Sequence, residues 1–186
     1  MKIIAITGMP LVGKGELTKE LINRGYKQVV MSNGIKDEMH KQNIEVTHEN
    51  IRNFATDIRK DRGRGVAAEL AIPAIKKLAK SEDVIVIDGI RSPEEIDIFK
   101  EKYGKDFILI SVNASFKVCL SRLKKRSKTR KDDPVDEAGL KWRNKEELSW
   151  GLAETISKAD YQIVNEGTLE EFKQKIGKIL SKVLPQ

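Results

Sequence analysis

A glycine-rich loop near the amino terminus constrains the fold of this 186-residue chain more than any other sequence feature. The loop consists of Gly8, Met9, Pro10, Leu11, Val12, Gly13, Lys14 and Gly15. An apolar run, residues 3–7, precedes it, and a helical pattern with Leu17, Leu21 and Ile22 on one face follows. A Gly-x4-Gly-Lys loop between a strand and a helix encloses phosphate with backbone N–H groups, and its lysine reaches the β- and γ-phosphate oxygens. The loop therefore predicts an α/β fold with a phosphate site after its first strand.

The residue after this lysine departs from the common form of the loop. Gly15 stands where a serine or threonine usually contacts magnesium. Glu16 follows, and Thr18 comes about one helical turn later. We therefore expect phosphates and water molecules, rather than a loop hydroxyl, to hold a magnesium ion.

Short apolar runs alternate with longer helical patterns along the chain. The runs are residues 3–7, 28–31, 84–88, 107–112 and 161–164. The run at 84–88 is continuous, which is typical of a central strand buried on both faces. The alternation predicts one α/β domain, residues 1–186, with a mostly parallel five-stranded sheet. A helical, charged segment, residues 33–80, separates the second run from the third.

Capping and breaking residues predict several helix boundaries. Thr47 and Ser92 are expected N-caps, and Thr168 with Glu171 forms a capping box. Gly25 should end the first helix, because glycine tolerates positive φ. Pro73 should kink its helix or start the second half of it.

Composition narrows the class of protein. The chain has 35 Lys and Arg against 28 Asp and Glu, a net charge of +7, and 39% hydrophobic residues. This hydrophobic content at modest net charge predicts a folded chain. No apolar run approaches a membrane span, no signal peptide is apparent, and a single cysteine, Cys119, excludes a disulfide framework. We expect a soluble cytoplasmic protein, whose charge is explained by a lysine-rich surface more readily than by an anionic partner.

Asp88 and Arg91 form a second group of candidate site residues. They lie at the end of the apolar run 84–88 and in the turn after it, where ligands bind in open α/β sheets. Asp88 could orient magnesium-bound water, and the fork of Arg91 could hold a phosphate. An ordinary Asp-Gly turn with an exposed arginine is the alternative.

The stretch from Arg122 to Lys131 is strongly basic, with seven of its ten residues Lys or Arg. Arg122 and Arg126 are four residues apart and share one helix face. They could belong to a mobile lid that brings arginines onto a phosphate. The alternatives are a solvated helix end and an RNA-contacting patch.

Five residues outside these motifs are expected to have no part in a binding or catalytic site. His40 and His48 should lie on the surface, Trp142 and Trp150 should pack within a long helix, and Cys119 should lie in the core.

The order of these motifs resembles nucleoside monophosphate kinases. The resemblance rests on the loop Gly8–Gly15, Asp88-Gly89-Ile90-Arg91, the pair Arg122 and Arg126, and the segment 159–167. It extends over essentially the whole chain and is strongest to archaeal adenylate-kinase-related proteins. It implies a three-layer fold with sheet order 2-3-1-4-5, an acceptor-binding segment at 33–80 and a lid at 127–145.

The resemblance also implies residue roles. The donor phosphates would be held by the loop with Glu16, and Asn165 and Gly167 would border the donor base. Lys36 and Arg91 would hold the acceptor phosphate, with Lys36 acting as a point charge where adenylate kinases have arginine. Lys14, Arg122, Arg126 and Asp88 would be the catalytic residues, with Asp88 contacting magnesium through water. Arg130 and Arg143 are further lid candidates.

These inferences predict an ATP- and Mg²⁺-dependent kinase, with AMP as the first candidate acceptor. The segment after Asp88 is one residue shorter than in adenylate kinases, which leaves the acceptor base open. One alternative is a kinase resembling dephospho-coenzyme-A kinase. The other is a nucleotide-gated basic module that binds RNA without turnover.

Overall fold

The computed structural model describes residues 1–126 and 136–185. One parallel sheet contains β1 (Lys2–Thr7), β2 (Lys27–Val30), β3 (Val84–Ile90), β4 (Phe107–Asn113) and β5 (Tyr161–Val164). Its order is β2-β3-β1-β4-β5, which confirms the predicted order 2-3-1-4-5. Arg130 lies outside the described residues, as does the second half of the basic stretch, residues 127–131.

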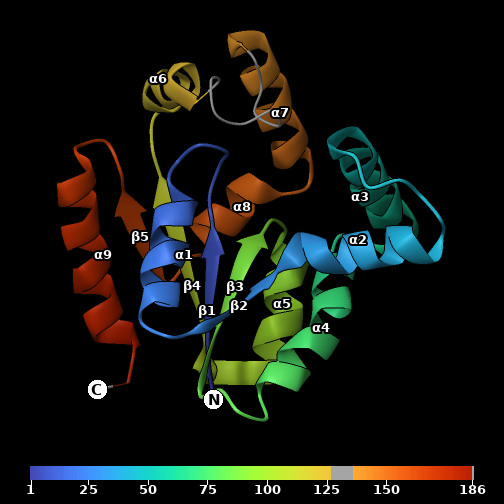
Figure 1. Cartoon of the computed structure of the whole chain (residues 1–186), viewed down its shortest axis with the longest axis horizontal. Helices are drawn as coiled ribbons and strands as arrows, with labels where there is room; N and C mark the ends of the chain where they lie inside the picture. Colours follow the sequence, from blue (N-terminus) through green and yellow to red (C-terminus); the bar gives the residue numbers. More distant parts are fainter. Residues whose placement is uncertain (127–135, 186) are drawn as a thin grey trace.

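Helices connect the strands and cover both faces of the sheet (Figure 1). They are α1 (Lys14–Asn23), α2 (Met31–Lys41), α3 (His48–Arg62), α4 (Val66–Leu78), α5 (Pro93–Tyr103), the 3₁₀ helix η1 (Gly104–Asp106), α6 (Phe116–Arg126), α7 (Glu137–Ser149), α8 (Leu152–Ser157) and α9 (Leu169–Val183). None of the described helices is long and apolar enough to cross a bilayer.

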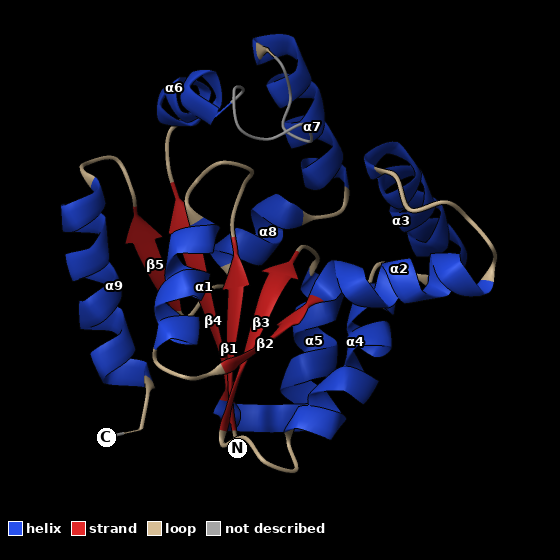
Figure 2. Cartoon of the chain, in the orientation of Figure 1, coloured by secondary structure: helices blue, strands red, loops and turns tan. Residues whose placement is uncertain are grey.

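Alternating side chains of β1 divide the core between the two faces. Ile3 and Ala5 join a cluster containing residues of α2, α4 and α5. Ile4 and Ile6 join the opposite cluster, with residues of α1 and α9. Figure 2 shows the resulting three layers, with the sheet between two sets of helices.

The predicted caps are present. The Thr47 hydroxyl accepts a hydrogen bond from the Asn50 backbone N–H at 3.1 Å, and both Ser92 and Thr168 form capping boxes. Gly25, just beyond α1, has a φ of 92°. These helix boundaries are therefore set by local sequence.

Four details differ from expectation. β2 ends at Val30 because Met31 already begins α2, and α4 continues through Pro73 rather than starting again there. The long helix expected after the basic stretch is divided into α7 and α8 at Gly151, whose φ is 96°. Ile22 is 45% exposed, because it lies about 100° around the helix from the buried Leu21.

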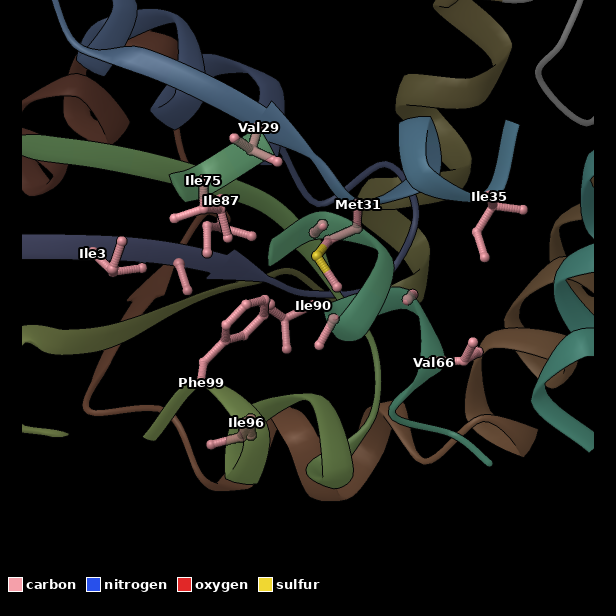
Figure 3. Close-up of a cluster of buried hydrophobic side chains, with 14 of the residues drawn as sticks. Ile3, Val29, Met31, Ile35, Val66, Ile75, Ile87, Ile90, Ile96 and Phe99 are labelled. Carbon is pink, nitrogen blue, oxygen red and sulfur yellow. The ribbon is translucent and has the colours of Figure 1, made fainter. Parts of the chain in front are cut away.

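Close contact between α2 and α4 places the helical segment against the sheet. Met31 and Ile35 of α2 and Ile75 of α4 lie in the cluster that Figure 3 shows around Ile87 of β3. At Gly34 the two helix backbones approach closely, since an added Cβ would lie 2.7 Å from the Leu70 Cβ. Both helices are therefore fixed to the sheet at their contact.

Gly34→Ala should lower the free energy of unfolding by about 1–3 kcal/mol, because the new methyl group would push α2 away from α4. Gly177→Ala, in α9, is the matched control. Nothing lies within 4 Å of its added Cβ, and helix propensity favours alanine by up to about 1 kcal/mol. Urea unfolding measures both variants, and equal effects would contradict the close approach at Gly34.

Candidate phosphate-binding and acceptor site

The glycine-rich loop has a backbone that side chains would obstruct. Gly8 and Gly13 have φ values of 142° and 109°. A Cβ on Gly8 would collide with the Val112 carbonyl, and one on Gly13 would collide with the Asn165 side-chain amide. Leu11 also has a positive φ, 65°, which no sequence motif predicts. The loop is therefore wrapped tightly against β4 and the end of β5.

Lys14 lies inside this loop. Its ammonium donates hydrogen bonds to the carbonyls of Gly8 at 2.7 Å and Met9 at 2.9 Å. Burial lowers the pKa of Lys14 to about 8, although the charges of Glu147 and Asp88 act in the opposite direction. The lysine is thus placed at the centre of the loop, where a bound phosphate would raise its pKa.

Asp88 lies beside the loop at the carboxyl end of β3, as the sequence predicts. Its Oδ2 accepts hydrogen bonds from Thr18 Oγ1 at 3.4 Å and Gln28 Nε2 at 3.2 Å. The carboxylate offers the oxygen chemistry that magnesium prefers, and space is open beside Gly15. Across the described parts of the chain, no group of three or more His, Cys, Asp or Glu could hold a metal ion.

Arg91 is paired with Glu147 of α7, a residue outside the predicted site motifs. Arg91 Nε lies 2.9 Å from Glu147 Oε2, and only 7% of the Glu147 side chain is exposed. The Glu147 charge, ahead of those of Glu95 and Asp88, raises the pKa of Arg91. The seven-residue spacing from buried Leu140 places Glu147 on the inner face of α7, a signal that the sequence does contain.

A second ion pair, which is buried, supports the turn that carries Arg91. Arg59 Nη2 lies 3.2 Å from Glu95 Oε1, and Glu95 Oε2 accepts a hydrogen bond from the Arg91 backbone N–H at 2.7 Å. Burial lowers the pKa of Arg59 and raises that of Glu95. The Trp150 ring lies beneath both arginines, 4.7 Å from the Arg59 guanidinium and 5.5 Å from that of Arg91. Trp150 is buried, as predicted.

Two neighbouring cavities meet at Arg91. The larger, about 620 Å³, contains the loop residues Lys14 and Gly15 together with Asp88. The smaller, about 220 Å³, lies between α2, α3 and α7, with Trp150 at one side. The residues that line both are Ser32, Lys36, Arg91, Arg143 and Glu147. The structure thus brings the predicted residues Lys14, Asp88, Arg91 and Lys36 together.

Arg122 does not line either of these two cavities. Its guanidinium donates hydrogen bonds to the carbonyls of Leu11, Val12 and Asn165 at 3.2, 3.0 and 2.9 Å. It therefore ties the loop to the end of β5 rather than facing the cavity that contains Lys14. Arg126 ends α6, but its side chain is outside what the structure describes, as are residues 127–135 of the predicted lid.

A third cavity, about 300 Å³, lies behind the loop. It is lined by Leu11, Gly13, Glu16, Arg122, Lys125, Asn165, Gly167, Leu169 and Phe172. The side-chain amide of Asn165 donates a hydrogen bond to the Val12 carbonyl at 2.8 Å. The predicted base-bordering residues Asn165 and Gly167 therefore share one cavity, next to the phosphate loop.

Trp142 differs from its prediction, whereas His40, His48 and Cys119 agree with theirs. Trp142 is 49% exposed rather than packed in the core, and its ring lies 4.6 Å from the guanidinium of Arg52. His40 and His48 are both exposed, as predicted, and His48 also lines the smaller cavity. Cys119 is buried.

The fold and the phosphate loop define a P-loop protein with a kinase-like architecture. A family model described as an AAA domain matches residues 4–151. A UPF0200 protein of Sulfurisphaera tokodaii is 41% identical over 184 residues, which cover 99% of this chain and 98% of the relative. A UPF0200/UPF0201 protein of Archaeoglobus fulgidus is 37% identical over 183 residues, 98% of this chain but only 56% of that longer protein. The chain belongs to the UPF0200 family.

Solved structures agree on the fold. A gluconokinase from Sinorhizobium meliloti superposes with a TM-score of 0.59 at 13% identity, covering 98% of this chain and 93% of that one. Shikimate kinase from Bacteroides thetaiotaomicron gives 0.57 at 14% identity, covering 98% of both chains. Likeness at such identities shows the fold alone, which is that of these P-loop kinases.

ATP binding near pH 8 should take up protons. About half of the Lys14 side chains are neutral at a pH equal to their pKa, and adjacent phosphate favours the charged form. Calorimetry in buffers of different ionisation enthalpy should show uptake of up to about half a proton per nucleotide. Lys14→Arg, which stays protonated, is the control. Equal uptake by both proteins would contradict the assignment to Lys14.

Proposed function

We propose that this protein is an ATP-dependent kinase that transfers the γ-phosphoryl group to a small phosphate-bearing acceptor, with AMP as the first candidate. The observation that carries the proposal is the shared wall of the two cavities. Lys36, Arg91 and Arg143 line both the loop cavity and the smaller one. Cations at such a junction can contact the phosphates of donor and acceptor together.

The residues of the larger cavity have separable roles in this reaction. Lys14 and the loop amides would hold the β- and γ-phosphates and neutralise charge that moves during transfer. Magnesium bound with ATP would neutralise further phosphate charge, and Asp88 would orient it through water. Asn165 and Gly167 would border the donor base in the cavity behind the loop.

The acceptor would enter from the smaller cavity. Its phosphate would contact Lys36 and Arg91, and the remainder would lie between Ile35, Ile51 and Trp150. This arrangement supports small-molecule transfer over the alternative of an RNA-associated module, because the junction cations face cavities. Salt-dependent RNA binding without turnover would favour the module.

Lys14→Met should leave the fold intact and lower ADP production by about 10³-fold or more, because the variant loses the cation nearest the transferring group. A coupled assay of ADP formation with ATP, Mg²⁺ and AMP measures this. Lys173→Met, an exposed lysine of α9, is the control. Near-normal turnover in a folded Lys14→Met protein would refute the phosphate-loop assignment.

Arg91→Ala should weaken AMP binding by about 1.5–3 kcal/mol, the contribution of a charged hydrogen bond, and should barely change adenosine binding. Since the substitution also leaves the Glu147 carboxylate without its partner, the control is Arg91→Ala combined with Glu147→Gln. Calorimetry with both ligands measures the effect. Equal losses for AMP and adenosine would contradict a role specific to phosphate.

A further inference from the structure

Glu147 places a carboxylate, in addition to that of Asp88, in the cavity that contains Lys14. It lines both cavities, and its side chain is 7% exposed. It shares the larger cavity with Lys14 and Asp88, and its charge raises the pKa of Lys14 more than that of Asp88 does. Glu147 therefore lines the cavity in which, under the proposed function, phosphoryl transfer would take place.

A carboxylate at this position repels phosphate oxygens. Its ion pair with Arg91 reduces that repulsion, but a neutral residue would avoid it altogether. An acceptor phosphate is already anionic and needs no base to attack the γ-phosphorus. An acceptor hydroxyl loses its proton during transfer, and a carboxylate beside it can accept that proton.

We propose that Glu147 is the general base of this site and that the reacting group of the acceptor is a hydroxyl. The proposal rests on the proposed kinase function. The acceptor oxygen forms a bond to the γ-phosphorus while the bond from that phosphorus to the β-phosphate oxygen breaks. The hydroxyl proton passes to the Glu147 carboxylate, and ADP leaves with the electron pair of the broken bond.

The substrate class follows from this geometry. The ion pair joins Arg91 Nε to Glu147 Oε2. The guanidinium of Arg91 and the ammonium of Lys36, which line both cavities, can hold a phosphate group elsewhere on the same acceptor. The acceptor is thus a phosphate-bearing alcohol that becomes a phosphomonoester at its hydroxyl.

The first test identifies the bond that forms. AMP, dephospho-coenzyme A and glycerol 3-phosphate each carry phosphate and at least one hydroxyl. Each is incubated with the full-length protein, ATP and Mg²⁺, and ³¹P NMR distinguishes a new phosphomonoester from a new phosphoanhydride. We expect a phosphomonoester. An anhydride on the acceptor's own phosphate would overturn the assignment of Glu147 while leaving the kinase function in place.

The second test compares variants of Glu147, using the probe that accelerates ADP formation by the wild-type protein. Glu147→Gln should lower kcat by about 10²- to 10⁴-fold, with the KM of the acceptor changed by no more than about threefold. Glu147→Asp, which keeps the carboxylate, should retain an intermediate kcat. Glu137→Gln removes an exposed carboxylate from the same helix and should match the wild type.

The outcomes separate the two proposals. A Glu147→Gln protein that keeps its kcat, or that changes mainly the acceptor KM, would show that Glu147 only positions Arg91 and would overturn the general base. If no probe accelerates ADP formation although ATP binds, the kinase function itself fails, and the proposal for Glu147 fails with it.

Discussion

The parallel pairing of β1 with β3 is the constraint on which the rest of the site depends. Ile6 pairs with Asp88, and after a shift in register Thr7 pairs with Ile90. The buried hydroxyl of Thr7 donates a hydrogen bond to the Ile90 carbonyl at 2.7 Å and so fixes the shifted register. The phosphate loop begins at the residue after Thr7, and Arg91 follows Ile90. A single backbone pairing therefore places Lys14 beside the turn that carries Asp88 and Arg91.

Two ion pairs, one buried and one partly exposed, then determine which side chains face the cavities. Arg59 with Glu95 and Arg91 with Glu147 join α3, α5 and α7 around the ring of Trp150. Buried ions of this kind contribute little net stability, since desolvation offsets much of their attraction, and apolar residues could join the same helices. What the ion pairs provide is a charged surface held in one orientation. Arg91 and Glu147 are both directed to the point where the two cavities meet.

The fold was predictable because its signals are local. Continuous apolar runs mark buried strands, capping boxes at Ser92 and Thr168 mark helix starts, and the loop spacing marks the phosphate site. The partners of the charged residues were less predictable, because they depend on how distant helices meet. Arg122 shares a helix face with Arg126, but the path of α6 takes it to the back of the loop. In the sequence, Glu147 is one of several glutamates in a charged helix. Its contact with Arg91 depends on the direction of α7, which is set by the turn at Gly151.

Charge in the larger cavity is nearly balanced, even though the chain as a whole carries +7. Its described lining has four cationic residues, Lys14, Lys36, Arg91 and Arg143, and three acidic ones, Glu16, Asp88 and Glu147. With Lys14 partly neutral near pH 8, the cavity alone cannot neutralise a triphosphate. In the proposed reaction, a nucleotide that enters with magnesium would bring its own neutralising charge, and Asp88 would then face a cation rather than a bare phosphate. The acidic residues of the site are thus compatible with binding a metal–nucleotide complex and unfavourable for the free anion.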